Sequence, residues 1–213
     1  MKKLGVESFS FAALITLAGG FLDAYTYCCR DKVFANAQTG NVVHVGIAVA
    51  QGDFHNIARY IIPIVAFACG VLLAMAIRER AGEFVERSAR HILLLEIAAM
   101  CLICFIPISP TANIAANVVV SFICALQAET FRKVNGLAFA STMCTGNLRS
   151  GSEHVYKALR NRNAAHVKDA AKYFCIILIF IAGGAIGYAM CTILGGTAII
   201  TAALPLIAAI VLV

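Results

Sequence analysis

The stretch Leu22-Asp23-Ala24-Tyr25-Thr26-Tyr27 is matched later in this chain of 213 residues by Leu126-Gln127-Ala128-Glu129-Thr130-Phe131. Two further blocks follow each copy in the same order, namely Thr39-Gly40-Asn41 with Thr145-Gly146-Asn147, and Ala58-Arg59-Tyr60 with Ala171-Lys172-Tyr173. Ordered matches between polar residues rarely arise by chance between two apolar stretches. We therefore interpret them as an internal repeat within a single domain, residues 1–213, with copies at about 8–108 and 111–213.

The composition places this repeat in a membrane. Hydrophobic residues make up 61% of the chain and charged residues only 13%, with a mean hydropathy of +0.86. Soluble domains are nearer half apolar and a quarter charged. Apolar runs of about 20 residues, the length a helix needs to cross the hydrocarbon core, recur along the chain. The sequence predicts an all-α membrane protein whose six transmembrane helices cover roughly Phe9–Tyr27, Ile57–Ile77, Ile92–Ile108, Thr111–Phe131, Ala171–Cys191 and Thr197–Val213.

Two additional segments, 33–52 and 137–159, each contain a Thr-Gly-Asn motif. In the first copy, polar residues lead into the motif and an apolar stretch, Val42–Ala50, follows it. This pattern predicts a loop that enters the membrane and a short helix that leaves it, a half-helix, with Thr39 or Asn41 capping its free N–H groups. Gly40 can supply an unusual backbone angle there. We expect the second copy to repeat the arrangement, although Arg149-Ser150 is polar for a half-helix.

The positions of Lys and Arg indicate orientation. If both Thr-Gly-Asn segments enter and leave on the same side, only Arg30, Lys32 and Arg59 of the 17 Lys and Arg residues lie outside. If both segments cross the membrane, the division becomes nearly even. The positive-inside rule favours the first arrangement, with both termini cytoplasmic. A mixed arrangement, in which only the first segment crosses, matches the charges equally well but treats the two repeats differently.

The preferred arrangement is a 3+3 repeat in which the second copy starts from the opposite side of the membrane. Such inverted repeats are common in transporters. The net charge of +6 is concentrated in short loops, so we expect a lipid bilayer as the partner and no nucleic acid. Gly183 and Gly187 form a GxxxG pattern that favours helix packing within one chain, with a homo-oligomer as the alternative.

In an inverted repeat, the N-terminal ends of the two half-helices would meet near the midplane. Their dipoles would favour an anionic or polar neutral solute. The substrate-binding candidates are Asp23, Thr39, Gly40, Asn41, Gln127, Thr145, Gly146 and Asn147. The alternative is that the two asparagines only cap helices in the core.

Ionisable residues at membrane depth usually face a cavity or a partner, which makes Asp23, His44 and Glu129 candidates for proton coupling. Asp23 and Glu129 could instead lie near the interface, where water reaches them, and His44 could be an ordinary buried group. For Glu96 we favour the interfacial position. The remaining histidines are expected in loops without metal-ligand spacing, so we predict no metal and no cofactor.

The motifs Gly19–Tyr25, Gln38–Asn41, Leu126–Ala128 and Cys144–Asn147 resemble the YoaK family of small bacterial integral-membrane proteins, whose function is unknown. The resemblance covers nearly the whole chain. It implies a bacterial inner-membrane protein with about six spans, and it brings neither a catalytic residue nor a substrate.

The leading functional hypothesis is a small-solute transporter or channel with a midplane site at the two Thr-Gly-Asn turns. No catalytic signature is present, so we expect a protein that is not an enzyme. The alternatives are a membrane-embedded enzyme without a recognisable motif and a scaffold or sensor whose basic stretch, Lys157–Lys172, binds anionic lipid or a partner.

Overall fold

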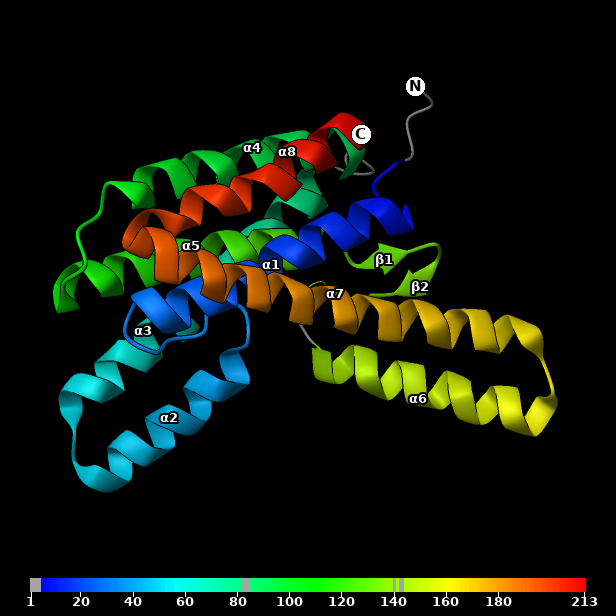
Figure 1. The fold of residues 1–213 in the computed structure, drawn as a ribbon, viewed down its shortest axis with the longest axis horizontal. Coiled ribbons are helices and arrows are strands. Elements are labelled where there is room, and N and C mark those ends of the chain that lie inside the picture. The colour runs from blue at the N-terminus through cyan, green and yellow to red at the C-terminus, as the bar shows by residue number, and fades with distance from the viewer. Residues whose placement is uncertain (1–4, 82–84, 140, 142–143) are drawn as a thin grey trace.

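The computed structural model describes residues 5–81, 85–139, 141 and 144–213, without the side chains of 81 and 85–88. Lys2, Lys3 and the side chain of Arg87, which enter the charge count, lie outside this part. Helices dominate the described chain (Figure 1), and a short antiparallel pair of strands follows α5. The elements are α1 (Phe9–Cys29), α2 (Gln38–Gln51), α3 (Phe54–Ala81), α4 (Val85–Cys104), α5 (Pro110–Thr130), β1 (Lys133–Val134), β2 (Leu137–Ala138), α6 (Cys144–Asn161), α7 (Ala164–Leu194), η1 (Gly195–Ala202) and α8 (Ala203–Leu212).

Four helical stretches are long and apolar enough to cross a membrane: Phe9–Cys29, Phe54–Arg80, Pro110–Thr130 and Ala164–Leu212. The last stretch contains α7, η1 and α8. Large apolar side chains point outward from these helices, including Leu72 at 66% exposure on α3 and Leu178 at 64% on α7. Apolar surface of this extent is typical of helices that contact lipid.

Glycines allow α1 and α7 to approach until their backbones touch. A Cβ added to Gly183 would lie 2.2 Å from the carbonyl oxygen of Leu17, and one added to Gly187 would lie 2.8 Å from that of Phe21. Both positions therefore require glycine. The contacts advance in the same direction along both helices, so α1 and α7 run parallel, and the GxxxG pattern is used within the chain.

Helices α3 and α5 form a second parallel pair. A Cβ on Gly70 would lie 2.6 Å from the carbonyl oxygen of Phe122, and eight residues further along α3 Arg78 pairs with Glu129 of α5. The other large contacts are α4 with α5, α1 with α8, α2 with α3, α6 with α7, and η1 with both α4 and α7. Under the sequence match, α4 with α5 corresponds to α8 with α1, and α2 with α3 corresponds to α6 with α7.

The chain reverses direction after α7 at Gly195, which has a positive φ of 56°. The 8 residues of η1 and the 10 residues of α8 together extend about 31 Å, enough to cross a bilayer. This segment matches the predicted span Thr197–Val213. In Figure 1, α8 returns beside α1, and the start of α1 lies on the same side of the bundle as the end of α8.

The two Thr-Gly-Asn segments form one arm each of two helical hairpins, α2–α3 and α6–α7, which diverge from the bundle (Figure 1). Helix α2 has 14 residues, about 21 Å, which is too short to cross the hydrocarbon core. Both helices begin before the motif, so Thr-Gly-Asn lies inside the first turn. The expectation that the motif is a non-helical turn preceding the helix is therefore wrong.

Candidate functional site

The loop before α2 folds back along the second half of α1. Asn36 donates its backbone N–H to Asp23 Oδ1 at 2.7 Å, and its side-chain amide donates to the Gly19 carbonyl at 3.1 Å. Gly19 is the central residue of the 21-residue helix α1. The N-terminal end of α2 therefore lies level with the middle of α1, and the Asp23 carboxylate accepts hydrogen bonds from the backbone that leads into it.

Asn41 holds this loop against α2. Its side chain is fully buried, accepts from the Phe34 N–H at 3.0 Å and donates to the Phe34 carbonyl at 2.7 Å. The predicted capping role is wrong, because Ala37 is the N-cap residue and has no side-chain capping bond. Thr39 is exposed, whereas Gly40 is close-packed: a Cβ there would lie 2.8 Å from the Phe34 ring.

The second motif shows the same division between buried and exposed positions. Asn147 is 3% exposed, whereas Thr145 and Gly146 are exposed. Cys144, the first residue of α6, lies close enough to Asp23 to be affected by its charge. The N-terminal ends of α2 and α6 therefore converge on Asp23, while their distal ends point in different directions (Figure 1).

Glu96 is a second buried carboxylate, and sequence reasoning assigned it wrongly to the interface. It is 1% exposed and accepts a 2.8 Å hydrogen bond from Gln127, the residue that matches Asp23 in the repeat. Cys124 is buried on α5 one turn before Gln127, within reach of the charges of both Asp23 and Glu96. The interruption of an apolar run by Glu96 was the signal in the sequence.

Among the described residues, four buried side-chain oxygens on these elements have no hydrogen-bond partner. They are Glu96 Oε1, Asn36 Oδ1, and, further along α5, Asn117 Oδ1 and Ser121 Oγ. Within the described part of the chain, neither Asp23 nor Glu96 forms an ion pair. Polar groups that lack a partner in a dry interior are costly, so these atoms add to the cost of burying the two carboxylates.

Arg30 is fully buried at the end of α1, although the sequence placed it in an outside loop. Its Nε donates to the Tyr25 hydroxyl at 2.9 Å. The remaining four N–H groups meet the side chain of Asn113 and the carbonyls of Ile103, Ile106 and Pro107. All five guanidinium donors are thus satisfied, which makes Arg30 a structural cap for the end of α4.

Two of the proton-coupling candidates, His44 and Glu129, lie apart from the buried carboxylates Asp23 and Glu96. His44 stacks on the Tyr60 ring at a centroid distance of 4.7 Å, within the α2–α3 hairpin. Glu129 forms ion pairs with Arg78 at 3.0 Å and with Arg132 at 3.2 Å, and its side chain is 15% exposed. These contacts favour the interfacial position that the sequence left open for Glu129.

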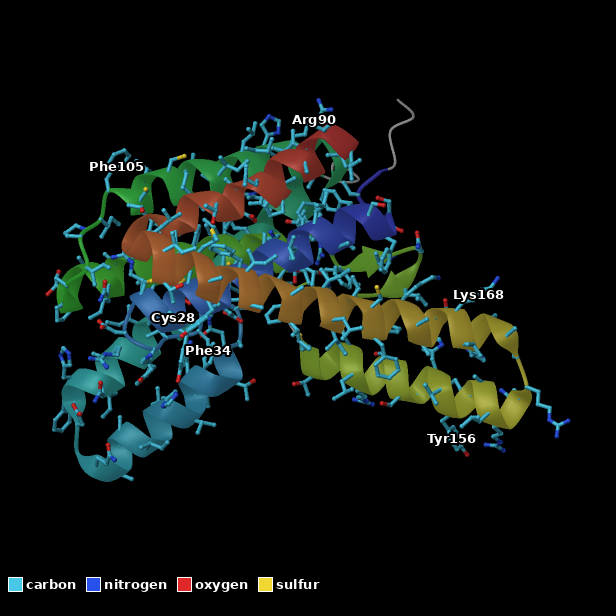
Figure 2. The ribbon with its side chains drawn as sticks, in the orientation of Figure 1. Cys28, Phe34, Arg90, Phe105, Tyr156 and Lys168 are labelled. Atoms are coloured by element: carbon cyan, nitrogen blue, oxygen red, sulfur yellow. The ribbon has the colours of Figure 1, made fainter. Side chains whose placement is uncertain are left out.

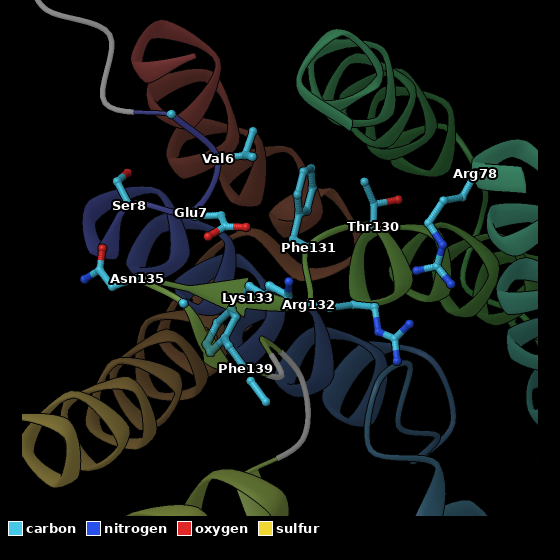
Figure 3. Close-up of a pocket in the computed structure, with 13 residues that line it drawn as sticks. Val6, Glu7, Ser8, Arg78, Thr130, Phe131, Arg132, Lys133, Asn135 and Phe139 are labelled. Carbon is cyan, nitrogen blue, oxygen red and sulfur yellow. The ribbon is translucent and has the colours of Figure 1, made fainter. Parts of the chain in front are cut away.

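A cavity of about 1310 Å³ opens beside this ion pair, between the start of α1, the β1–β2 hairpin and the ends of α3 and α5 (Figure 3). Arg78, Arg132 and Lys133 line it together with Glu7, and Phe131 and Phe139 supply apolar walls. Arg78, Arg132 and Lys133 are among the basic residues that the charge count predicts on the cytoplasmic side of the membrane. The cavity begins about one helical turn beyond Gln127.

Long apolar helices around a buried polar centre define a multi-pass transmembrane protein. The chain belongs to the family described as "Protein of unknown function (DUF1275)", whose model matches residues 11–212. It is similar to the UPF0700 transmembrane protein YoaK of Bacillus subtilis (strain 168), with 23% identity over 180 residues that cover 82% of this chain and 80% of that relative. The family resemblance expected from the sequence is thereby confirmed. No solved structure matches the chain.

Proposed function

We propose that this protein is a proton-coupled transporter of a polar neutral solute, with its site between Asp23 and the Glu96–Gln127 pair. The observation that carries the proposal is the burial of these two carboxylates, at 5% and 1% exposure, without a cationic partner among the described residues. Ionisable groups in this position are expensive and mark ion, proton or substrate pathways. The proposal assigns no catalytic step.

An inverted repeat explains how the site is built. It is supported by the contact pattern, in which α1 with α7 and α3 with α5 are matched parallel pairs. It is supported as well by the convergence of α2 and α6 on Asp23 from two different hairpins. In this arrangement the matched residues Asp23 and Gln127 contribute one polar side chain each from the two copies, and a solute between them contacts both repeats.

The position of Asp23 narrows the solute class. An anion would be attracted to the N-terminal end of α2 by the helix dipole. The Asp23 carboxylate already accepts backbone N–H groups of the loop that leads into α2, so a second anion there would meet a like charge. We therefore retain the polar neutral solute and give up the anionic one. A proton on Asp23 or Glu96 would remove the cost of burying an unpaired carboxylate during the transport cycle.

A line of polar residues on α5 offers a route to this site. It starts at the end of the bundle beside Arg30, which the charge count predicts to face the outside. Asn113, Asn117 and Ser121 recur at intervals of four residues and are all buried. Such spacing puts them on one face of the helix. The unpartnered oxygens of Asn117 and Ser121 can bind a passing solute or water.

Helix lengths and charge support one orientation in the membrane. Helix α7 has 31 residues, about 46 Å, so about a third of it extends beyond a hydrocarbon core of about 30 Å. The excess lies at its N-terminal end, beside the polar helix α6, where Lys168 and Tyr156 point away from the hairpin (Figure 2). We propose that this hairpin and both termini face the cytoplasm of a bacterial inner membrane, in agreement with the positive-inside rule.

The proposal is tested by flux into proteoliposomes loaded with a pH-sensitive dye. A panel of sugars, polyols, amides and zwitterionic amino acids is first screened for solutes that raise the melting temperature of the protein. We expect at least one such solute to enter together with protons. Asp23→Asn and Glu96→Gln should abolish the proton signal, because neither amide can carry a proton between the two sides.

The matched control is Glu153→Gln on α6. Glu153 is exposed, and among the described residues its ion pair is with its helix neighbour Arg149 at 3.1 Å, so its substitution should leave flux and proton signal unchanged. Absence of flux for every solute that stabilises the protein would overturn the transport proposal. The scaffold or sensor hypothesis would then take its place, with the projecting α6–α7 hairpin as the contact surface.

A further inference from the structure

The α6–α7 hairpin brings together three metal-ligating side chains that are distant in the sequence. We expected His154 and His166 in loops, but they lie on α6 and α7 and face each other, with 3.2 Å between their Nδ1 atoms. Asp169, one turn after His166 on the same face of α7, places Oδ2 3.9 Å from His154 Nδ1. One ligand atom from each of the three lies within 4.8 Å of the others.

The spacing fits shared coordination of a small divalent cation. Two ligand atoms on a tetrahedral zinc ion, each at about 2.05 Å, are separated by about 3.3 Å. The observed 3.2 Å between the two imidazole nitrogens agrees with this value. The carboxylate oxygen is slightly farther away and needs only a small side-chain rotation to complete a set of three ligands.

The surroundings hold these ligands in position. Lys172 donates to Asp169 Oδ1 at 2.9 Å, which leaves Oδ2 facing the histidines. The Tyr173 ring packs against the His154 ring at a centroid distance of 5.7 Å. Residues that orient metal ligands in this way raise the affinity of a site. The exposed fractions, 17% for the His154 side chain and 23% for that of Asp169, leave a path for an ion and a water molecule.

We propose that His154, His166 and Asp169 form a binding site for a divalent transition metal ion of the zinc class. Two imidazoles and one carboxylate suit zinc and its neighbours better than magnesium or calcium, which prefer sets of oxygen ligands. A water molecule takes the fourth position. The bound ion joins α6 to α7 and thereby fixes the hairpin whose first turn carries Thr145-Gly146-Asn147 and lies near Asp23.

The test uses the full-length protein in detergent micelles, purified with a tag that contains no histidine. Zn²⁺ affinity is measured by competition with a chromogenic chelator, and Co²⁺ is used as a spectroscopic probe. We expect one tightly bound ion per chain and a four-coordinate Co²⁺ spectrum without a sulfur-to-cobalt charge-transfer band. The last feature matters because all nine cysteines are free and could bind metal themselves.

Substitution of a ligand should weaken Zn²⁺ binding by at least about tenfold, as loss of even an orienting residue can do. The variants are His154→Ala, His166→Ala and Asp169→Asn, and the control is His55→Ala, an exposed histidine on α3. His154→Cys replaces a ligand by a ligand. It should retain the ion and add the sulfur-to-cobalt band that the natural protein lacks.

The proposal is overturned if His154→Ala binds Zn²⁺ as the natural protein does, or if the natural protein binds none at micromolar metal. It is equally overturned if metal-loaded His154→Cys shows no sulfur-to-cobalt band. Unchanged circular dichroism and metal-free melting temperature establish that a variant is folded, so loss of binding is not mistaken for unfolding.

Discussion

At the scale of single residues, two asparagines at matched positions are buried while their threonine neighbours are exposed. Asn41 makes three side-chain hydrogen bonds, two with the Phe34 backbone and one to Gln38 at 2.8 Å. Thr39 points outward two residues earlier. Within this motif, Asn41 therefore fixes the loop before α2, whereas Thr39 does not.

Asn41→Ala should lower the free energy of unfolding by about 1–3 kcal/mol, because the half-buried Phe34 N–H and carbonyl lose their partner. The measurement is SDS-induced unfolding in mixed micelles. Thr39→Ala provides the matched control and should change this free energy by less than about 0.5 kcal/mol. Equal effects of the two substitutions would contradict the role given to Asn41.

Burial of individual polar residues was only partly predictable. Asp23 was identified because it interrupts an apolar run far from other charges. Glu96 was missed because it follows a charged loop, although the helix carries it a full three turns inward from Val85. Arg30 was missed because its acceptors come from Asn113 and the end of α4, more than 70 residues away in the sequence.

At the scale of helices, backbone contact between α1 and α7 depends on particular glycines. Gly183 faces the Leu17 carbonyl directly, whereas a Cβ on the adjacent Gly184 would stand 3.8 Å from the nearest atom, the Gly20 carbonyl oxygen. Gly184 therefore has room for a methyl group, whereas its neighbour Gly183 does not.

Gly183→Ala should destabilise the protein by about 1–3 kcal/mol, since the added methyl forces two helices apart. Gly184→Ala has room for the methyl and should be neutral or slightly stabilising through improved helix propensity. Melting temperatures in detergent compare the two. The packing described for α1 and α7 is wrong if Gly183→Ala melts at the temperature of the natural protein.

The start of α3 gives a pH-dependent prediction. Asp53 accepts hydrogen bonds from the backbone N–H of Asn56 at 3.1 Å and from its side-chain amide at 2.6 Å. The backbone bond from Asn56 is the main cause that lowers the pKa of Asp53 below its ordinary value of 3.8. A lowered pKa in the folded state means that the carboxylate stabilises the fold above this ordinary value, and that the contribution is lost as the pH falls through the folded pKa.

Asp53→Ala should therefore lower the melting temperature at pH 7, and the difference from the natural protein should shrink as the pH falls below about 4. Thermal scans of both proteins across this range provide the comparison. A difference that stays constant down to the lowest pH would show that the substitution acts through something other than the charge.

Helices were more predictable than their ends. Each predicted span overlaps a helix, because about 20 apolar residues are readily recognised. The half-helices start earlier than expected because Gln38 and Cys144 already have helical geometry. At α2, Asn41 bonds both the Gln38 side chain and the Phe34 backbone, which ties the first turn to the loop before it. The metal-ligand cluster was invisible because only the antiparallel packing of α6 on α7 places His154 beside His166.

At the scale of the whole molecule, polar residues from the two halves of the chain lie close to one another. Asp23 comes from the first half, and Gln127 with Cys124 from the second. Their contacts with Asn36 and Glu96 cross between elements that are remote in the chain. The central claim is that this region opens to water during a transport cycle, although Cys124 is only 2% exposed in the present conformation.

Reactivity of Cys124 toward a small membrane-impermeant thiol reagent tests this claim most directly. The experiment compares two versions of the chain in proteoliposomes, one retaining only Cys124 and the other retaining only Cys191, which is buried on α7 away from the site. We predict that Cys124 is labelled, that a stabilising solute slows the labelling, and that Cys191 stays unmodified. If Cys124 is as unreactive as Cys191 while an exposed Cys28 version is labelled fully, the polar centre is a dry structural core and the transporter proposal is contradicted.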